Sequence, residues 1–391
     1  MAKVTSPTTT FNNEYFSFIV SESWKHIGAS QEHADILAHN LLVGGLQGKL
    51  HQGLGVIEAV TIPYEAGILD TTTTPEIESE GETWAVYNGK KSSGHYVCTL
   101  MAQTAIEKAR KHGISIVFGY DHCDGGNFSN YTQMAMKEGM FAMSSNNSVP
   151  LNAPFGGMDP AMSCPPFDAA LVGGEELPLV TSIMIGEGYD SHICDAIVND
   201  RDLHVAALVD QDTGELTADA RKWGSLIEGY GRVADCKAPW TFLTPRLYSL
   251  NIWNEVMTAI INPKGKIAPE LPAVPSDFFT MEDAPCPVGG SYILVIDPSH
   301  FGPIEEVKRK SDLFVKAIKE NRPRAGFNEV FIPDEWGLKA LATATDEHQV
   351  MDAHWDGFKD FLKRSGTSIE ELNAKWEAKV GAERAAETIR K

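Results

Sequence analysis

The sequence contains no long apolar run and no closely spaced pair of cysteines. Its apolar stretches are interrupted by Gly, Pro or a charged residue well before the ~20 residues that a membrane span needs. The first residues lack the apolar segment of a signal peptide. The six cysteines are scattered, with no CxxC motif. We therefore expect no membrane span, no disulfide framework and no zinc knuckle, but a cytoplasmic protein with mostly reduced, buried cysteines.

Positive charge is also scarce. The chain has 33 Lys and Arg against 53 Asp and Glu, a formal net charge of −20 at pH 7. A surface of this charge repels nucleic acid and anionic lipid, so we expect neither as a partner. A small anionic substrate would need a local group of Arg, Lys or backbone amides to overcome the same repulsion.

The motifs of several common enzyme classes are missing. There is no Walker loop, no HExxH and no G-x-S-x-G, which argues against P-loop, zincin and serine-hydrolase functions. One G-x-G-x-x-A pattern occurs at residues 229–234. No strand is predicted before it, and Pro239 interrupts any helix after it, so we interpret it as an ordinary loop and not as a dinucleotide fingerprint.

The remaining pattern predicts a large globular protein of mixed order. With 391 residues and 43% apolar content, the chain can bury a core that serves two or three domains. Helices and strands do not alternate regularly, which favours an α+β or mixed α/β fold with a mixed sheet. We predict that residues 1–80 pack against a helical region at 300–391, and that residues 81–299 form a central mixed-sheet domain for cofactor and substrate. Helices are predicted at residues 12–26, 30–43, 96–112, 129–138, 190–200, 246–261, 303–320, 349–364 and 368–388, and strands at 84–87, 114–118, 140–144, 179–185 and 292–296.

His122 is the strongest candidate for chemistry. It follows a predicted buried strand and lies between Asp121 and Asp124 in a glycine-rich loop. Histidine is the side chain best suited to moving a proton near neutral pH. The same pattern also fits a solvated loop residue. A metal site with Asp124 is a third interpretation, but it lacks enough further ligands.

Two other polar clusters follow predicted elements. His51 and Gln52 lie in a loop after a helix, where they either contact a ligand or simply end the helix. Residues 146–148 (Asn-Asn-Ser), followed by Pro-Phe-Gly-Gly at 154–157, suit a pyrophosphate or a carboxamide, and suit a plain turn equally well. The predicted substrate contacts are Lys49, Asp124 and Asn146.

Taken in order, these segments resemble the malate/L-lactate dehydrogenase-like family, which includes ureidoglycolate and sulfolactate dehydrogenases, diketogulonate reductase and cyclic-imine carboxylate reductases. The resemblance implies a mixed-sheet fold distinct from the Rossmann fold and a homodimer with active sites near the subunit interface. It also implies NADH or NADPH bound in an extended groove and hydride transfer at the 2-carbon of a 2-hydroxy or 2-keto acid. The matching segments are residues 41–53, 94–113, 117–126, 146–157, 181–182, 210–217, 245–250, 293–302 and 326–335.

The resemblance also implies roles for individual residues. His122 falls on a strand-end histidine that is assigned as the proton acceptor in some members. His51 or Gln52 would then orient the reacting oxygen of the substrate. The positions that look like nucleotide contacts are Ser148, Thr181, Ser182, Arg246, Pro333, Asp334 and Glu335.

Departures from the family pattern concentrate at functional positions. The family's Ser-His-Gly, followed three residues later by Arg, reads His51-Gln52-Gly53 and then Val56. Valine cannot replace the bidentate contact of an arginine with a carboxylate, so we expect a substrate larger or less acidic than malate. The family's Asp-Met-Ala-Thr-Ser reads Pro-Leu-Val-Thr-Ser at 178–182, and its Lys-Gly-Tyr-Gly reads Arg-Leu-Tyr-Ser at 246–249. Side chains in place of glycine hinder close approach of a cofactor to the backbone.

These substitutions leave two alternative hypotheses. One is a redox-neutral lyase, isomerase or hydratase on the same scaffold, in which His122 takes a proton from a carbon acid and Arg246 steadies the oxyanion. The other is a non-catalytic relative that binds a partner through residues 345–391. Activity that strictly requires NAD(P) would exclude the first hypothesis.

Overall fold

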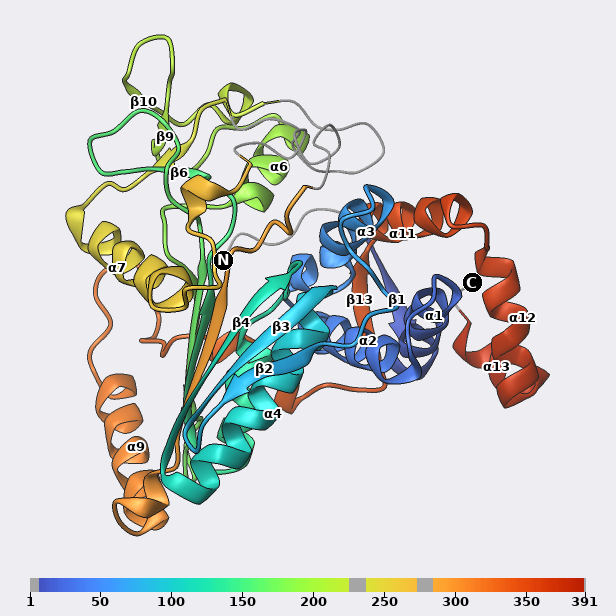
Figure 1. Cartoon of the computed structure of the whole chain (residues 1–391), viewed down its shortest axis with the longest axis horizontal. Coiled ribbons are helices and arrows are strands. Elements are labelled where there is room, and N and C mark those ends of the chain that lie inside the picture. Colours follow the sequence, from blue (N-terminus) through green and yellow to red (C-terminus); the bar gives the residue numbers. More distant parts are fainter. Residues whose placement is uncertain (1–6, 225–236, 273–283, 390–391) are drawn as a thin grey trace.

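A seven-stranded sheet forms the centre of the computed structural model, which describes residues 7–224, 237–272 and 284–389 (Figure 1). The predicted loop at 229–234 and Cys236 lie outside these residues. The strands, in their spatial order, are β2 (Glu76–Glu80), β3 (Trp84–Ser92), β4 (Ile114–His122), β12 (Ser291–Ile296), β5 (Phe141–Asn146), β7 (Pro166–Leu171) and β8 (Leu179–Met184).

Strand directions in this sheet are mixed, as predicted. β3 and β4 are parallel and are joined by helix α4 (Gly94–His112), whereas β12 runs antiparallel to both β4 and β5. The register places Ser291, the first residue of β12, opposite Gly119 on one side and Asn146 on the other. The ends of β4 and β5 therefore meet the start of β12 at one edge of the sheet.

Helices α4 and α5 (Ser129–Lys137) cover one face of the sheet (Figure 1). The predicted face of α4 is buried, with Ala102, Ala105 and Ala109 fully enclosed, because small side chains let the helix lie close to the strands. Gly113 ends α4 in the left-handed conformation with φ +84°, which glycine adopts without steric strain.

A smaller region lies beyond the strand ends, at the top of Figure 1. It contains a four-stranded sheet and helices α6 (Asp190–Val198) and α7 (Pro245–Glu255). The helix predicted at 246–261 changes its winding, since Val256–Ile260 form a π-helical turn. The four short strands, in spatial order, are β10 (Leu216–Thr217), β9 (Leu208–Val209), β11 (Trp240–Thr241) and β6 (Asn152–Ala153).

The early and late parts of the chain share one apolar core. β1 (Thr8–Asn12) pairs antiparallel with β13 (Glu347–Met351), so the helix predicted from residue 349 begins only at residue 352. Large buried side chains in this core are Phe11, Trp24, Phe358, Phe361 and Trp376. The helices are α1 (Asn13–His26), α2 (Gln31–Leu46), α3 (Ile57–Glu65), α11 (Asp352–Arg364), α12 (Ile369–Val380) and α13 (Ala382–Thr388).

The apolar side chains of residues 350–385 are thus buried in the core that they share with the early part of the chain. The predicted helix 368–388 is two helices, because Gly381 breaks it with φ +87°. The same core also takes in Cys123 and Val149 from the middle of the chain, and the division at residues 80 and 300 stays a prediction.

Two further helices lie outside this core, namely α9 (Ile304–Lys319) and α10 (Glu335–Ala342), with α9 at the lower left of Figure 1. No helix in the described part of the chain has the length and apolar content to cross a membrane. The remaining short helices are the 3-10 turns Leu50–Gln52, Leu54–Val56, Ala220–Lys222, Ala268–Glu270 and Pro298–His300.

Candidate active site

His122 is the last residue of β4 and is fully buried. Its Nδ1 lies 2.8 Å from the carbonyl oxygen of Cys123, and its Nε2 lies 2.8 Å from Oγ of Ser291. A carbonyl oxygen only accepts, so Nδ1 carries the proton and the Ser291 hydroxyl donates to Nε2. Burial lowers the pKa of His122, which keeps the ring neutral at pH 7. The predicted base is therefore a neutral imidazole, and its Nε2 is connected to the surrounding groups by the Ser291 hydroxyl.

Ser291 was not among the residues predicted from the sequence. It follows two glycines whose backbones pass very close to neighbouring segments: a Cβ on Gly290 would lie 2.2 Å from the Thr258 carbonyl oxygen, and one on Gly289 would lie 1.9 Å from that of Lys266. Only glycine permits this approach. The sequence feature that could have pointed to Ser291 was the Gly-Gly pair directly before the predicted strand.

Asn146, the last residue of β5, brings an amide to the same edge. Its backbone carbonyl accepts a hydrogen bond from the Asn254 side chain at 2.9 Å, and the neighbouring Asn147 amide donates to Glu255 at 2.9 Å. The side-chain oxygens of Asn146 and Asn254 are buried without a partner among the described residues. Buried polar atoms are usually hydrogen-bonded, so these two oxygens are free to accept from a bound ligand.

Helix α7 connects this edge with a cationic group. Arg246, in its first turn, is exposed and forms no ion pair with a described residue. Arg246 precedes Asn254 by eight residues, about 12 Å along the axis. A helix N-terminus with an arginine suits a phosphate, and the far end suits an amide, so the arrangement fits an extended dinucleotide. Ser148 lies half-buried at the start of the next loop.

A second group forms around Asp168 on β7. Lys49 Nζ lies 3.0 Å from Asp334 Oδ1, which joins two predicted residues that are 285 positions apart. Asp168 is 1% exposed, is hydrogen-bonded to Ser182 on β8, and leaves its Oδ1 without a partner among the described residues. Burial raises the pKa of Asp168 to about 7, although Ser182 and Lys49 act in the opposite direction. Asp168 was missed because strand β7 was not predicted.

Glu335, predicted as a nucleotide contact, is enclosed by the protein instead. Its carboxylate lies 2.9 Å from Lys319 Nζ and 2.6 Å from Lys339 Nζ, and it accepts from the Ile332 amide at 3.0 Å. Burial alone would raise the pKa of Glu335, but these donors lower it to about 2. A carboxylate with this many donors is bound internally. The preceding Pro333 is exposed.

His51 and Gln52 lie half-buried on a 3-10 turn. The His51 ring packs edge-on against that of His354, with 5.2 Å between centroids, and the side-chain oxygen of Gln52 is buried without a partner among the described residues. Val56, four residues after Gln52, is buried in the same apolar cluster as Cys123, the neighbour of His122. The segment therefore belongs to the same apolar core as Cys123.

The predicted residues thus fall into groups. His122, Asp124, Asn146 and Ser148 follow the strand ends, and the Asp124 carboxylate shapes its loop by accepting from the Gly126 amide at 2.6 Å. Lys49, Ser182 and Asp334 surround Asp168, while Thr181 lies half-buried on β8.

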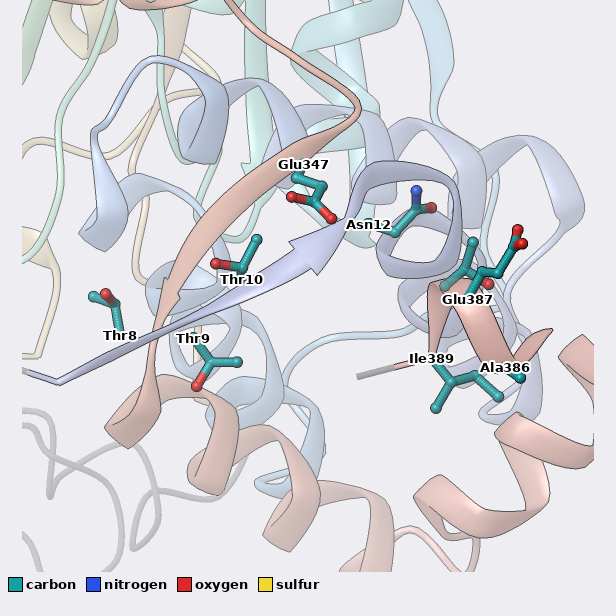
Figure 2. A pocket seen from close by; sticks show the side chains of 9 residues that line it. Thr8, Thr9, Thr10, Asn12, Glu347, Ala386, Glu387 and Ile389 are labelled. Carbon is teal, nitrogen blue, oxygen red and sulfur yellow. The ribbon is translucent and has the colours of Figure 1, made fainter. Parts of the chain in front are cut away.

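The hollow between β1 and α13 does not contain these groups. In the described part of the chain, no three His, Cys, Asp or Glu residues are placed to hold a metal ion. One hollow, between β1 and α13, is lined by Thr8, Thr9, Thr10, Asn12, Glu347 and Glu387 among others (Figure 2). None of the predicted site residues lines it. The buried pair His122 and Ser291 and the unpartnered Asn146 oxygen mark the strand ends as the candidate site.

Comparison with known proteins identifies the family. The profile of the family described as malate/L-lactate dehydrogenase matches residues 13–357. The chain belongs to this family. It is 26% identical over 363 residues to the L-sulfolactate dehydrogenase of Methanocaldococcus jannaschii, covering 90% of this chain and 96% of that protein. It is 27% identical over 302 residues to the malate/(S)-sulfolactate dehydrogenase of Methanothermus fervidus, covering 75% of this chain and 80% of that protein.

The fold agrees with this membership. The solved structure of the sulfolactate dehydrogenase from Methanocaldococcus jannaschii superposes with a TM-score of 0.79 at 23% identity, covering 93% of this chain and 99% of that one. The predicted non-Rossmann, mixed-sheet fold of the malate/L-lactate dehydrogenase-like family is confirmed, and the chain is an enzyme of the dehydrogenase class that acts on CH–OH groups.

Proposed function

We propose that this enzyme is an NADH- or NADPH-dependent oxidoreductase of a 2-hydroxy or 2-keto acid that is larger or less acidic than malate. One observation carries the proposal: in a chain of the malate/L-lactate dehydrogenase family, the ends of β4, β5 and β12 bring together His122, Ser291 and Asn146. A neutral base and a free amide acceptor at one sheet edge suit proton transfer beside a carboxamide.

The cofactor would be held along α7. Arg246 with the helix N-terminus would bind the phosphates, Ser148 would contact the ribose side, and the Asn146 oxygen would accept from the carboxamide. Thr181, Ser182, Pro333 and Asp334 would contribute further nucleotide contacts, whereas the Glu335 carboxylate is occupied by Lys319 and Lys339. A bound nicotinamide supplies the hydride acceptor or donor for the 2-carbon of the substrate.

His122 would accept or return the proton of the oxygen that is bonded to this 2-carbon. The Ser291 hydroxyl donates to Nε2, so a proton from the substrate hydroxyl reaches the ring through Ser291 when the alcohol is oxidised, and returns by the same path on reduction. His51 or Gln52 would orient the reacting oxygen, and Lys49, Asp124 and Asn146 would contact the substrate. The low pKa of His122 favours the proton-accepting form.

Two observations support a substrate unlike malate. Val56 is buried among apolar side chains, and Lys49 already has a carboxylate partner in Asp334. Neither offers an unpaired cation to a second substrate carboxylate. No structural observation favours the redox-neutral alternative, and the family relationship favours hydride transfer.

The proposal extends to the assembly and its compartment. Exposed apolar side chains on and beside α9, Leu313, Phe314 and Phe301, suit a homodimer interface, because large apolar patches are uncommon on monomers. The five described cysteines form no disulfide with one another, which suits a reducing, cytoplasmic location.

Calorimetric titration with NADH and then NADPH tests cofactor binding without the substrate. We expect micromolar affinity for at least one, about −8 kcal/mol, and a roughly tenfold weaker affinity in Arg246→Ala. Arg309→Ala is the matched control, since Arg309 is an exposed arginine on α9 paired with Glu306. Absence of heat with both cofactors would refute the proposal.

Turnover of a panel of bulky 2-keto acids with the preferred cofactor tests the base. His122→Ala should lower kcat by at least about 100-fold while leaving cofactor affinity within a few-fold of wild type. Equal turnover in the two proteins would show that His122 is not the base.

A further inference from the structure

The thiols of Cys123 and Cys286 face each other beside the candidate site. Their sulfur atoms are 3.5 Å apart, and the two side chains are 0% and 2% exposed. Both are free thiols within one apolar cluster. A disulfide needs about 2.05 Å between the sulfurs, so a side-chain movement of roughly 1.5 Å would join them.

Backbone contacts tie this pair to the catalytic candidate. Cys123 follows His122, and its carbonyl accepts the hydrogen bond from Nδ1 of that ring. Val288, two residues after Cys286, forms a bridge with His122, and the Pro287 carbonyl accepts from the Val149 amide at 3.1 Å. A bond between the sulfurs would therefore join the end of β4 to the segment that leads into β12.

We propose that Cys123 and Cys286 form a site of reversible thiol oxidation that controls the strand-end site. The oxidant is a peroxide. One sulfur attacks a peroxide oxygen, the O–O bond breaks, and a sulfenic acid and one water result. The second sulfur then attacks the sulfenic sulfur and releases the second water. Two thiols and one peroxide thus become one disulfide and two waters.

The surroundings set how easily the pair reacts. Burial raises the pKa of the Cys123 thiol well above its usual range, so little thiolate is present at pH 7. The pair stays reduced under reducing conditions and responds to sustained exposure to peroxide. The effect on activity rests on the proposed function, whereas formation of the disulfide does not.

Closing the bond should change the geometry at His122. A displacement near 1 Å at a catalytic group is enough to cost about 100-fold in rate, so we expect NAD(P)-dependent turnover to fall by roughly ten- to 100-fold and to return with dithiothreitol. The cross-link should also restrict opening of the segment bonded to Val149, so exchange of its amide hydrogen should slow by at least about tenfold.

The experiment treats the full-length reduced protein with hydrogen peroxide, stops the reaction with catalase, and blocks remaining thiols with N-ethylmaleimide. Non-reducing peptide mapping should reveal a linked peptide containing Cys123 and Cys286, lighter than the sum of the reduced peptides by two hydrogens. Turnover and hydrogen exchange at Val149 are measured on the same samples, before and after dithiothreitol.

Cys286→Ala should abolish the link and the loss of turnover, whereas Cys194→Ala, at a buried cysteine in a different cluster, should retain both. If Cys286→Ala does not fold, Cys123→Ala replaces it. Cys123 and Cys286 that remain free after treatment overturn the proposal. A formed link that leaves both turnover and Val149 exchange unchanged overturns it as well. Slower Val149 exchange in the linked protein supports the proposal even if no 2-keto acid is turned over.

Discussion

Asp168 and Glu335 are both 1% exposed, yet their carboxyl groups have opposite surroundings. Glu335 accepts from two lysines and a backbone amide, and the pKa of its carboxyl is lowered to about 2. Asp168 has one hydroxyl partner and an unpaired oxygen, and burial raises its pKa to about 7. A satisfied buried charge contributes to stability, whereas an unsatisfied one is typical of sites that bind a proton or a ligand.

Replacing Asp168 tests this comparison most strongly. The pKa of Asp168 is raised from 3.8 to about 7, so its contribution to stability is complete below pH 3.8 and is lost as the pH rises towards 7. Asp168→Asn removes that loss. Relative to wild type, the free energy of unfolding of the variant should rise by on the order of 4 kcal/mol between pH 4 and pH 8. Urea denaturation across this range measures it, and parallel curves would refute the assignment.

Replacing Glu335 should have the opposite sign. Glu335→Gln keeps the shape but removes the charge that binds Lys319 and Lys339, so the protein should lose roughly 3 kcal/mol at pH 7. Because the pKa of Glu335 is lowered from 4.5 to about 2, the difference should shrink as the pH falls between these values. Glu306→Gln, an exposed residue on α9, is the control and should leave the free energy of unfolding nearly unchanged. Equal losses in both variants would contradict the comparison.

Replacing Lys49 should have the smallest effect on stability. Lys49→Met removes the partly exposed ion pair with Asp334, at a cost of about 1 kcal/mol. Lys49 also lowers the pKa of Asp168, so in the variant the pH-dependent loss of stability should extend to higher pH. Denaturation curves of Lys49→Met, with and without Asp168→Asn, separate the two effects. A shift that persists without Asp168 would show that another group titrates.

Local sequence patterns predicted the fold better than the site. The helix ending at Gly113 and the buried strand after it follow from apolar spacing and a glycine stop. The strand was predicted to end at residue 118, but it continues to His122, because β3 lies alongside and Ser291 pairs opposite Gly119. Pairing between distant strands leaves no trace in local propensity.

The group around Asp168 shows the same limit of prediction from local sequence. The Pro-Pro pair at 165–166, where β7 begins, and the charge of Asp168 within the strand are features that argue against a strand, so both the strand and the acid were missed. The pairing of Lys49 with Asp334 joins positions 285 residues apart, and no spacing rule reaches that far. Lys49 was predicted as a substrate contact and Asp334 as a nucleotide contact, but their contact with each other was not predicted.

The pairing of β1 with β13 has a consequence for the order in which segments of the chain become buried during synthesis. Phe11 and Trp24 leave the ribosome early, but Phe358, Phe361 and Trp376, which enclose them, follow more than 300 residues later. At typical translation rates of ~5–20 residues per second, α1 and α2 expose apolar faces for tens of seconds. The first helices to be made are thus among the last to be buried, and they form the segment of this enzyme most in need of a chaperone.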